Sequence, residues 1–112
     1  MAVVLVDGEN VRRSTWPNVS RERLVELARD WAAAHGHQVL VVFDGRAPEE
    51  AEDVVGSGAE TADEWIVREA ARLDDFWLVT SDRELRRRVG EGAKRVVGGG
   101  AFLRELLGLS EE

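Results

Sequence analysis

The chain has 112 residues, of which 44% are apolar and none is cysteine, and its formal net charge at pH 7 is -7. This length suits a single domain, which we expect to span residues 1–112, and the lack of cysteine excludes disulfides, thiolate nucleophiles and Cys-based zinc sites. The acidity argues against a protein that coats nucleic acid through a broad basic surface, but it does not exclude a nuclease whose acids lie in its site.

The N-terminal sequence MAVVLV is apolar but is interrupted at Asp7. It is therefore too short for the core of a signal peptide, and no other apolar run is long enough to span a bilayer. We expect a cytoplasmic protein without membrane association.

Two apolar runs in the first half of the chain predict buried strands. They cover residues 3–6 and 38–43, and each is followed by an Asp-Gly pair, which is typical of a turn. The pairs are Asp7-Gly8 and Asp44-Gly45.

A helix is predicted between these strands, after a loop that contains Trp16. Ser20 can cap the start of this helix and Gly36 can end it. Its apolar residues recur at helical spacing, at Leu24, Leu27, Ala28, Trp31 and Ala32. His35 and His37 flank the terminal glycine, and we interpret them as cap and loop residues and not as catalytic bases.

The segment 46–60 is polar, and its only apolar pair, Val54-Val55, predicts a short edge strand. Thr61 and Glu64 then match the T-x-x-E capping box that opens a helix. The residues that this helix should bury are Ala62, Ile66, Ala70 and Leu73.

The last third of the chain repeats the alternation. Residues 76–80 predict a strand, and Ser81 with Glu84 predicts a second capping box and a helix. Residues 94–97 predict a final short strand and 101–107 a final helix. Because strands and helices alternate, the predicted fold class is α/β, a three-layer α/β/α sandwich with a mostly parallel sheet of four to five strands.

Four aspartates should meet at one edge of this sheet. Asp7, Asp44 and Asp82 follow apolar runs and Asp63 opens a helix, and the C-terminal ends of parallel strands share the edge where ligands bind. At about 5 Å and an effective dielectric of about 20, each pair would repel by roughly 3 kcal/mol, so the group requires protons or a hard divalent cation. Taken singly, each has a simpler explanation, as a turn residue or a first-turn acid.

Other polar residues near this edge are candidates for binding a substrate. Arginines that could contact phosphates are Arg12, Arg13, Arg46, Arg83, Arg86 and Arg87. A solvated helix face is the alternative explanation for those after Asp82. Trp16 could stack on a base, but we expect it to pack in the core; Trp31, Trp65 and Trp77 should be core or half-buried residues.

The ordered motifs VDGEN, VVFDG, ETADE and VTSDR resemble those of the NYN ribonucleases, a PIN-like family, and are most similar to the YacP-like proteins. The resemblance spans residues 3–83 and, more weakly, 101–107. It implies a PIN-like fold in which Mg²⁺ or Mn²⁺ is held for RNA hydrolysis. The metal-binding and catalytic set would be Asp7, Asp44, Asp63 and Asp82, with Asn10 and Ser81 as catalytic helpers. The chain departs from the family in its short 46–60 segment and in Glu9, which stands where an aromatic residue is common.

We therefore predict a metal-dependent ribonuclease, acting as an endonuclease, that hydrolyses phosphodiester bonds of single-stranded RNA with a metal-activated water. The alternative is a catalytically weak or inactive PIN-like module that binds RNA or a protein, which the short 46–60 segment favours. A phospho-acceptor receiver domain fits less well because the first strand lacks paired acids, and no glycine-rich motif indicates a dinucleotide or P-loop site. The sequence leaves open whether two chains form a homodimer.

Overall fold

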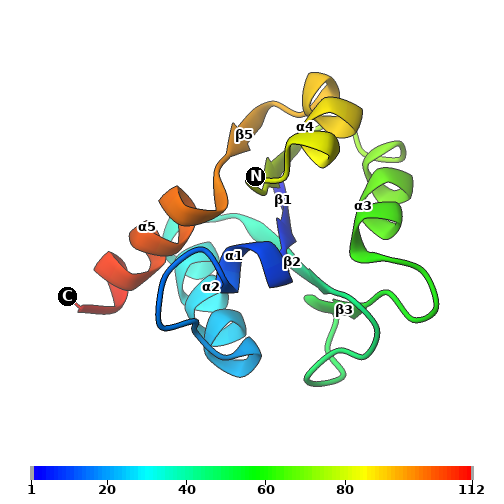
Figure 1. The fold of residues 1–112 in the computed structure, drawn as a ribbon. Helices are drawn as coiled ribbons and strands as arrows, with labels where there is room; N and C mark the ends of the chain where they lie inside the picture. Colours follow the sequence, from blue (N-terminus) through cyan, green and yellow to red (C-terminus); the bar gives the residue numbers. More distant parts are fainter. Residues whose placement is uncertain (1, 112) are drawn as a thin grey trace.

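A five-stranded parallel sheet runs through the centre of the molecule (Figure 1). The computed structural model describes residues 2–111. The strand order across the sheet is β3-β2-β1-β4-β5. The strands are β1 (Val3–Asp7), β2 (Gln38–Phe43), β3 (Val54–Gly56), β4 (Phe76–Val79) and β5 (Arg95–Val97). The predicted α/β fold is confirmed, and all five strands are parallel.

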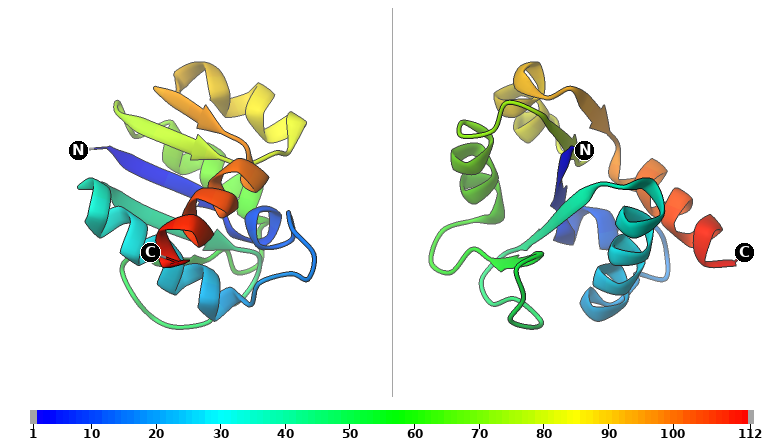
Figure 2. Two further views of the ribbon diagram at one scale, coloured as in Figure 1. Left: turned by 90° about the vertical axis from the view of Figure 1, so that its left-hand side faces the viewer. Right: turned by 180° about the vertical axis from the view of Figure 1, so that it is seen from behind.

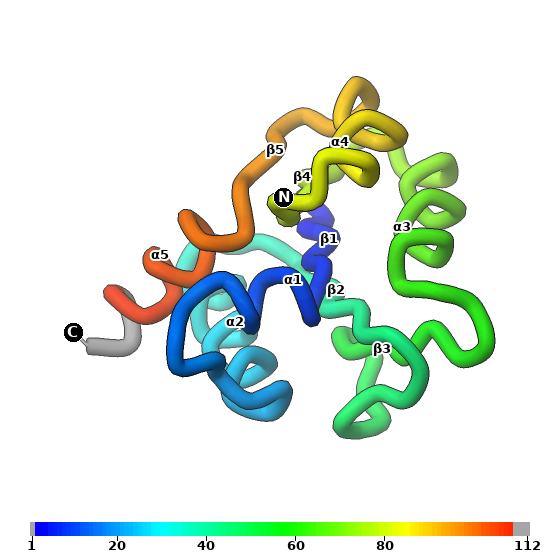
Figure 3. The backbone as a smooth tube through the Cα atoms, in the orientation of Figure 1, coloured from blue at the N-terminus to red at the C-terminus, as the bar shows by residue number. Residues whose placement is uncertain are grey.

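Helices cover both faces of this sheet (Figures 2 and 3). One face packs against α1 (Gly8–Arg12), α2 (Arg21–His35) and α5 (Gly99–Glu111). The other face packs against α3 (Ala62–Ala70) and α4 (Arg83–Val89), and a short 3₁₀ turn at Gly90–Gly92 follows α4. In the described residues no helix is both long and apolar enough to cross a membrane.

The central strand β1 is apolar because both faces of the sheet are covered there. Val4 and Val6 pack with the α1, α2 and α5 layer and Leu5 packs with the α3 and α4 layer, because successive side chains of a strand point to opposite faces. All three are fully buried. A strand covered on both sides has no place for a polar residue along its length, so its first polar residue, Asp7, comes where it ends.

The predicted helix ends are mostly confirmed. The Ser20 hydroxyl accepts a hydrogen bond from the Arg23 backbone N–H at 3.0 Å, and Gly36 ends α2 with φ of 70°. The Thr61 hydroxyl accepts a hydrogen bond from the Glu64 backbone N–H at 3.2 Å. These side chains satisfy backbone groups that a helix leaves unpaired at its ends.

Two expectations from the sequence were wrong in this region. Gly8–Arg12 is a helix and not a turn. It has five residues, and its buried residues are Gly8 and Val11, so it is too short to show a helical pattern of apolar residues. Trp16 is 89% exposed and does not pack in the core. Trp31 is buried, and Trp65 and Trp77 are half-buried, as predicted.

Gly8 offers a test of this packing. A Cβ atom at Gly8 would lie 2.7 Å from Phe43 Cε1 and 2.9 Å from the Val42 carbonyl oxygen, and the Phe43 ring is fully buried. We expect Gly8→Ala to lower the free energy of unfolding by about 1–3 kcal/mol or more, measured by urea denaturation. The matched control is Gly108→Ala, where a Cβ meets nothing within 4 Å and helix propensity predicts a gain of up to about 1 kcal/mol. Equal midpoints for both variants would show that Phe43 can move aside.

Candidate active site

A pocket of about 430 Å³ opens at the C-terminal edge of the sheet. The residues that line it are Asp7, Glu9, Asn10, Arg13, Ser14, Asp44, Asp63, Ser81 and Asp82. They come from the ends of β1 and β2, from α1 and the loop after it, from the first turn of α3, and from the connection between β4 and α4. The structure therefore places the four predicted aspartates around one pocket.

Asp7 is the buried member of this set. Its residue exposure is 6%, and its Oδ2 atom accepts a hydrogen bond from the Thr80 hydroxyl at 2.8 Å. Burial raises the pKa of Asp7 to about 6, the hydrogen bond from Thr80 opposes this rise, and the negative charges of the other three aspartates add to it. Near neutral pH and without a cation, Asp7 is a charged group held in a place that disfavours its charge.

Asp63 lies in the first turn of α3 and faces the same electrostatic field. Burial raises the pKa of Asp63, and the charges of Asp82 and Asp44 raise it further. The neighbouring Arg88 has the opposite, smaller effect. The pocket thus raises the pKa of two of its acids, through the same two causes.

Asp44 and Asp82 are each oriented by the start of a helix. Asp44 Oδ1 accepts a hydrogen bond from the Ala62 backbone N–H at 2.7 Å, and Asp82 Oδ1 accepts one from the Leu85 N–H at 2.9 Å. Asp82 is therefore the N-cap of α4, and the predicted capping box led by Ser81 is wrong. Either side chain can satisfy such an N–H, and the aspartate lies one residue closer to the helix.

Ser81 is instead part of a clamp that joins three segments. Asn10 Oδ1 accepts a hydrogen bond from the Ser81 backbone N–H at 2.8 Å, and the Ser81 hydroxyl oxygen accepts one from the Gly99 N–H at 2.8 Å. A Cβ atom at Gly99 would lie 2.7 Å from Asn10 Oδ1, so this approach requires glycine. The clamp fixes α1, the β4–α4 connection and the start of α5 around the pocket, and the catalytic roles of Asn10 and Ser81 stay predictions.

The predicted substrate-binding arginines are distributed unevenly around this pocket. Arg13 contributes to its lining. The others predicted lie outside the described lining: Arg12, Arg46, Arg83, Arg86 and Arg87. Arg87 pairs with Glu84 on the exposed surface of α4, as expected for a solvated helix face. Ser14 also lines the pocket, and the sequence carried no signal for it because its loop has no recognisable motif.

The donor atoms of the pocket suit a hard divalent cation. Asp7, Asp44 and Asp82 each use one carboxylate oxygen in a hydrogen bond, and the second oxygen of each accepts none from the described residues. Mg²⁺ and Mn²⁺ prefer such oxygen ligands, and the pocket has no sulfur or imidazole ligand. Within residues 2–111, however, no three acidic or histidine side chains are arranged to hold a metal as they stand. A cation would have to draw these side chains inward.

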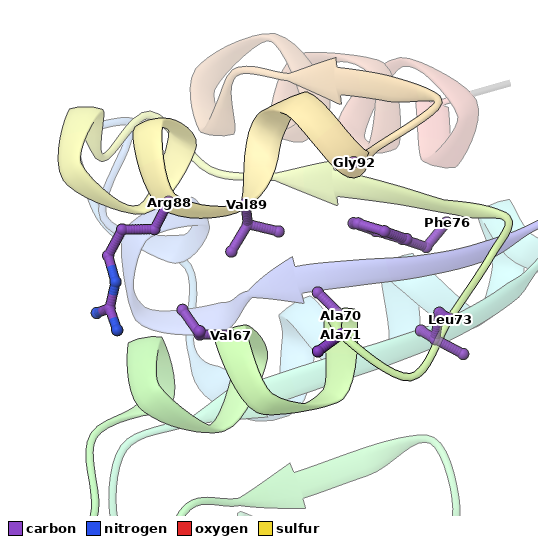
Figure 4. A pocket seen from close by; sticks show the side chains of 8 residues that line it. All are labelled: Val67, Ala70, Ala71, Leu73, Phe76, Arg88, Val89 and Gly92. Atoms are coloured by element: carbon purple, nitrogen blue, oxygen red, sulfur yellow. The ribbon is translucent and has the colours of Figure 1, made fainter.

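A second hollow, of about 290 Å³, lies between α3 and α4, beside the start of β4 (Figure 4). Its lining is mostly apolar: Val67, Ala70, Ala71, Leu73, Phe76, Arg88, Val89 and Gly92. It contains no carboxylate and no nucleophilic side chain. The chemistry of the molecule is therefore concentrated at the edge of the sheet.

The chain is similar to a known protein family and to solved structures. A model of the YacP-like NYN domain matches residues 4–107. A crystal structure of Rae1 (YacP) from Bacillus subtilis is similar with 26% identity and a TM-score of 0.75, covering 99% of this chain and 76% of that one. A structure of a point mutant of the same protein has 28% identity and a TM-score of 0.80, covering 99% and 78%. No curated protein matches the chain.

The raised pKa of Asp7 predicts how stability depends on pH without metal. Because the folded protein holds this proton more tightly than the unfolded chain, stability falls as pH rises from about 4 to about 6. The difference between 3.8 and about 6 corresponds to about 3 kcal/mol. In chelator, Asp7→Asn should be more stable than the wild type by about this amount at pH 7 and should lose the advantage below pH 4. Urea denaturation across this range checks it, and parallel curves for the two proteins would contradict it.

Proposed function

This chain belongs to the family of YacP-like NYN domains, and on that premise we propose that it is a metal-dependent ribonuclease acting on single-stranded RNA. The family model covers most of the chain, and its solved relatives share the PIN-like, nuclease-type fold. We propose that cleavage is endonucleolytic and that Mg²⁺ or Mn²⁺ is the cofactor. The proposed ligands are Asp7, Asp44, Asp63 and Asp82.

The observation that carries this proposal is the buried carboxylate of Asp7 among three other aspartates. Helix capping accounts for Asp44 and Asp82 taken singly, but burial and mutual repulsion both oppose holding all four charges together. A divalent cation reverses this balance, since each carboxylate that repelled the others then becomes a ligand. The energy lost in the metal-free protein becomes affinity for the metal.

Each residue of the pocket would have a distinct part in hydrolysis. A divalent cation bound there would supply an activated water and would stabilise the leaving oxygen of the phosphodiester. Asp7, which is buried, and Asp63, which is half-buried, contribute negative charge, while Asp44 and Asp82 are held in fixed directions by the starts of α3 and α4. The Asn10–Ser81–Gly99 clamp keeps these elements at a constant separation, which preserves the alignment that an in-line attack requires.

The second candidate is a PIN-like module that binds RNA or a protein without cleaving. It is favoured by the lack of a preformed group of three metal-binding side chains among the described residues. It is also favoured by the short segment 46–60, which folds back on β2: the Ser57 and Gly58 N–H groups donate to the Phe43 and Gly45 carbonyls at 2.9 and 3.0 Å. These bonds hold the end of the segment close to β2 and shorten the part that is free to contact a substrate.

Metal binding can be measured apart from catalysis. At a concentration of 100 times its Kd, Mn²⁺ should stabilise the wild type by about 2.7 kcal/mol, which is about 10 °C in Tm for a domain of this size. Asp63→Asn should lose most of this shift. Asp74→Asn is the control, because Asp74 is exposed and lies before β4, at the opposite edge of the sheet. An equal shift in all three proteins would place the metal elsewhere.

Cleavage of a labelled single-stranded RNA tests the catalytic proposal. Mn²⁺ or Mg²⁺ should support it and chelator should stop it. Asp7→Asn and Asp82→Asn should each lower kcat at least about 100-fold, the upper end of the cost of losing a group that merely supports a metal ligand. Asparagine keeps the hydrogen bonds to Thr80 and Leu85, so both variants should fold, which circular dichroism checks.

The outcomes separate the two candidates. Cleavage that survives in Asp82→Asn would refute the proposed site. A wild type that binds Mn²⁺ but cleaves no RNA of a varied panel would favour the non-catalytic module.

A further inference from the structure

The loop between α1 and α2 has an unusual composition for a surface segment beside an acidic pocket. Arg13 and Ser14 line that pocket, and Trp16 follows two residues later. Trp16 is the exposed large apolar side chain of the described residues, with 89% exposure. Two residues span at most about 7 Å between Cα atoms, so the indole begins within one side-chain length of the pocket rim.

Glu9 organises the positive charge at the base of this loop. Its Oε1 atom lies 2.7 Å from Arg21 Nε, and its Oε2 atom lies 2.9 Å from Arg12 Nε and 3.4 Å from Arg13 Nε. Both carboxylate oxygens are therefore occupied by guanidinium groups. Although Glu9 lines the pocket, it gathers three arginines around one acid, so this group of four side chains has a net charge of +2.

The three arginines are not equally available to a ligand. Arg12 is 19% exposed and also donates to the Val19 carbonyl at 3.2 Å. Arg21 lies over the Phe43 ring, 5.7 Å from its centroid. Arg13 is 63% exposed, and its contact with Glu9 is the longest of the three. Arg13 can therefore turn toward a phosphate without the loss of a buried contact, while the other two hold the loop.

The loop is closed at its base, so Trp16 is carried on an anchored segment. The Val19 N–H donates to the Arg12 carbonyl at 3.2 Å, and the Arg12 side chain donates back to the Val19 carbonyl. The Ser14 hydroxyl also donates to the Val11 carbonyl at the end of α1. An aromatic side chain that is presented in this way loses little conformational entropy when a ligand covers it.

The opposite rim, on α4, presents its arginines outside the pocket lining. On α4, Arg87 pairs with Glu84, and Arg88 pairs with Glu64 of α3. Arg83 and Arg86, on the same helix, carry further positive charge, but neither lines the pocket. Of the arginines on these two rims, Arg13 is therefore the one placed to contact a polyanion in the pocket.

We propose that Trp16 and Arg13 form a nucleotide subsite beside the cleavage pocket, with a base of single-stranded RNA stacked on the indole and an adjacent phosphate bound by the guanidinium. This inference rests on the proposed function and identifies residues that bind its RNA substrate. Stacking accepts any base, so the subsite would bind without strong sequence preference. The subsite would also bind RNA without any contribution from the short 46–60 segment.

Two measurements on the whole chain test the subsite. The first is the affinity for a short fluorescein-labelled single-stranded RNA, by anisotropy with Ca²⁺ in place of Mn²⁺; the second is kcat and KM with Mn²⁺. Trp16→Ala should weaken binding and raise KM by roughly 5- to 150-fold, with kcat unchanged. Trp16→Phe should restore most of the loss, because a smaller ring still stacks.

Arg13→Gln should lower the slope of log affinity against log salt by about 0.7–1. Its matched control is Arg72→Gln, because Arg72 is 75% exposed, is paired with a nearby glutamate on its own segment, and lies after α3 at the far edge of the sheet. The control should leave both the affinity and the slope unchanged.

The results distinguish the subsite from the nuclease proposal. A wild type that cleaves RNA, with affinity and KM equal in Trp16→Ala, Arg13→Gln and the control, would overturn the subsite and leave the nuclease. RNA binding that depends on Trp16 in a protein that cleaves nothing would support the subsite and overturn the nuclease. A wild type with no measurable affinity for the RNA would overturn the subsite.

Discussion

The burial of one carboxylate at the end of the central strand is the constraint on which the rest of the site depends. β1 is covered on both faces, so Asp7 leaves the sheet inside the protein and not at its surface. Its charge is disfavoured by burial and by three neighbouring acids, and one hydroxyl, from Thr80, compensates in part. The folded protein tolerates this cost because the extensive apolar packing around β1 exceeds it. The remaining imbalance is the physical basis of the proposed metal site.

Hydrogen bonds around the pocket keep the other acidic side chains close to Asp7. Asp44 and Asp82 would relax away from Asp7 if they were free to rotate, but each is bonded to the first turn of a helix. The Asn10–Ser81–Gly99 clamp prevents the helices from separating, and the lack of a side chain at Gly99 permits the close contact. At this edge, hydrogen bonds from backbone N–H groups and the close approach at Gly99 thus hold the elements in position, as apolar packing does elsewhere in the fold.

Two different solutions to negative charge lie two residues apart, where β1 ends and α1 begins. Asp7 has no cationic partner in the described protein, whereas Glu9, two residues later, is surrounded by Arg12, Arg13 and Arg21. Under the proposed function, the first arrangement leaves a charge for a metal to neutralise, and the second turns an acid into an anchor for positive side chains. A phosphodiester needs both, a cation at the reacting phosphate and basic groups along the strand.

The sequence by itself determined the class of fold and the identity of the acids, because apolar runs, capping residues and Asp-Gly pairs are local signals that a chain shows without its partners. The spacing of apolar residues, together with the turn and capping residues between them, was enough to place Asp7, Asp44, Asp63 and Asp82 at one edge of the sheet. The tertiary structure alone decided the cap of α4, the role of Ser81, the three arginines on Glu9 and the exposure of Trp16. Each of these depends on which of several competing partners lies within hydrogen-bonding or packing distance, and that distance is set by segments far apart in the chain.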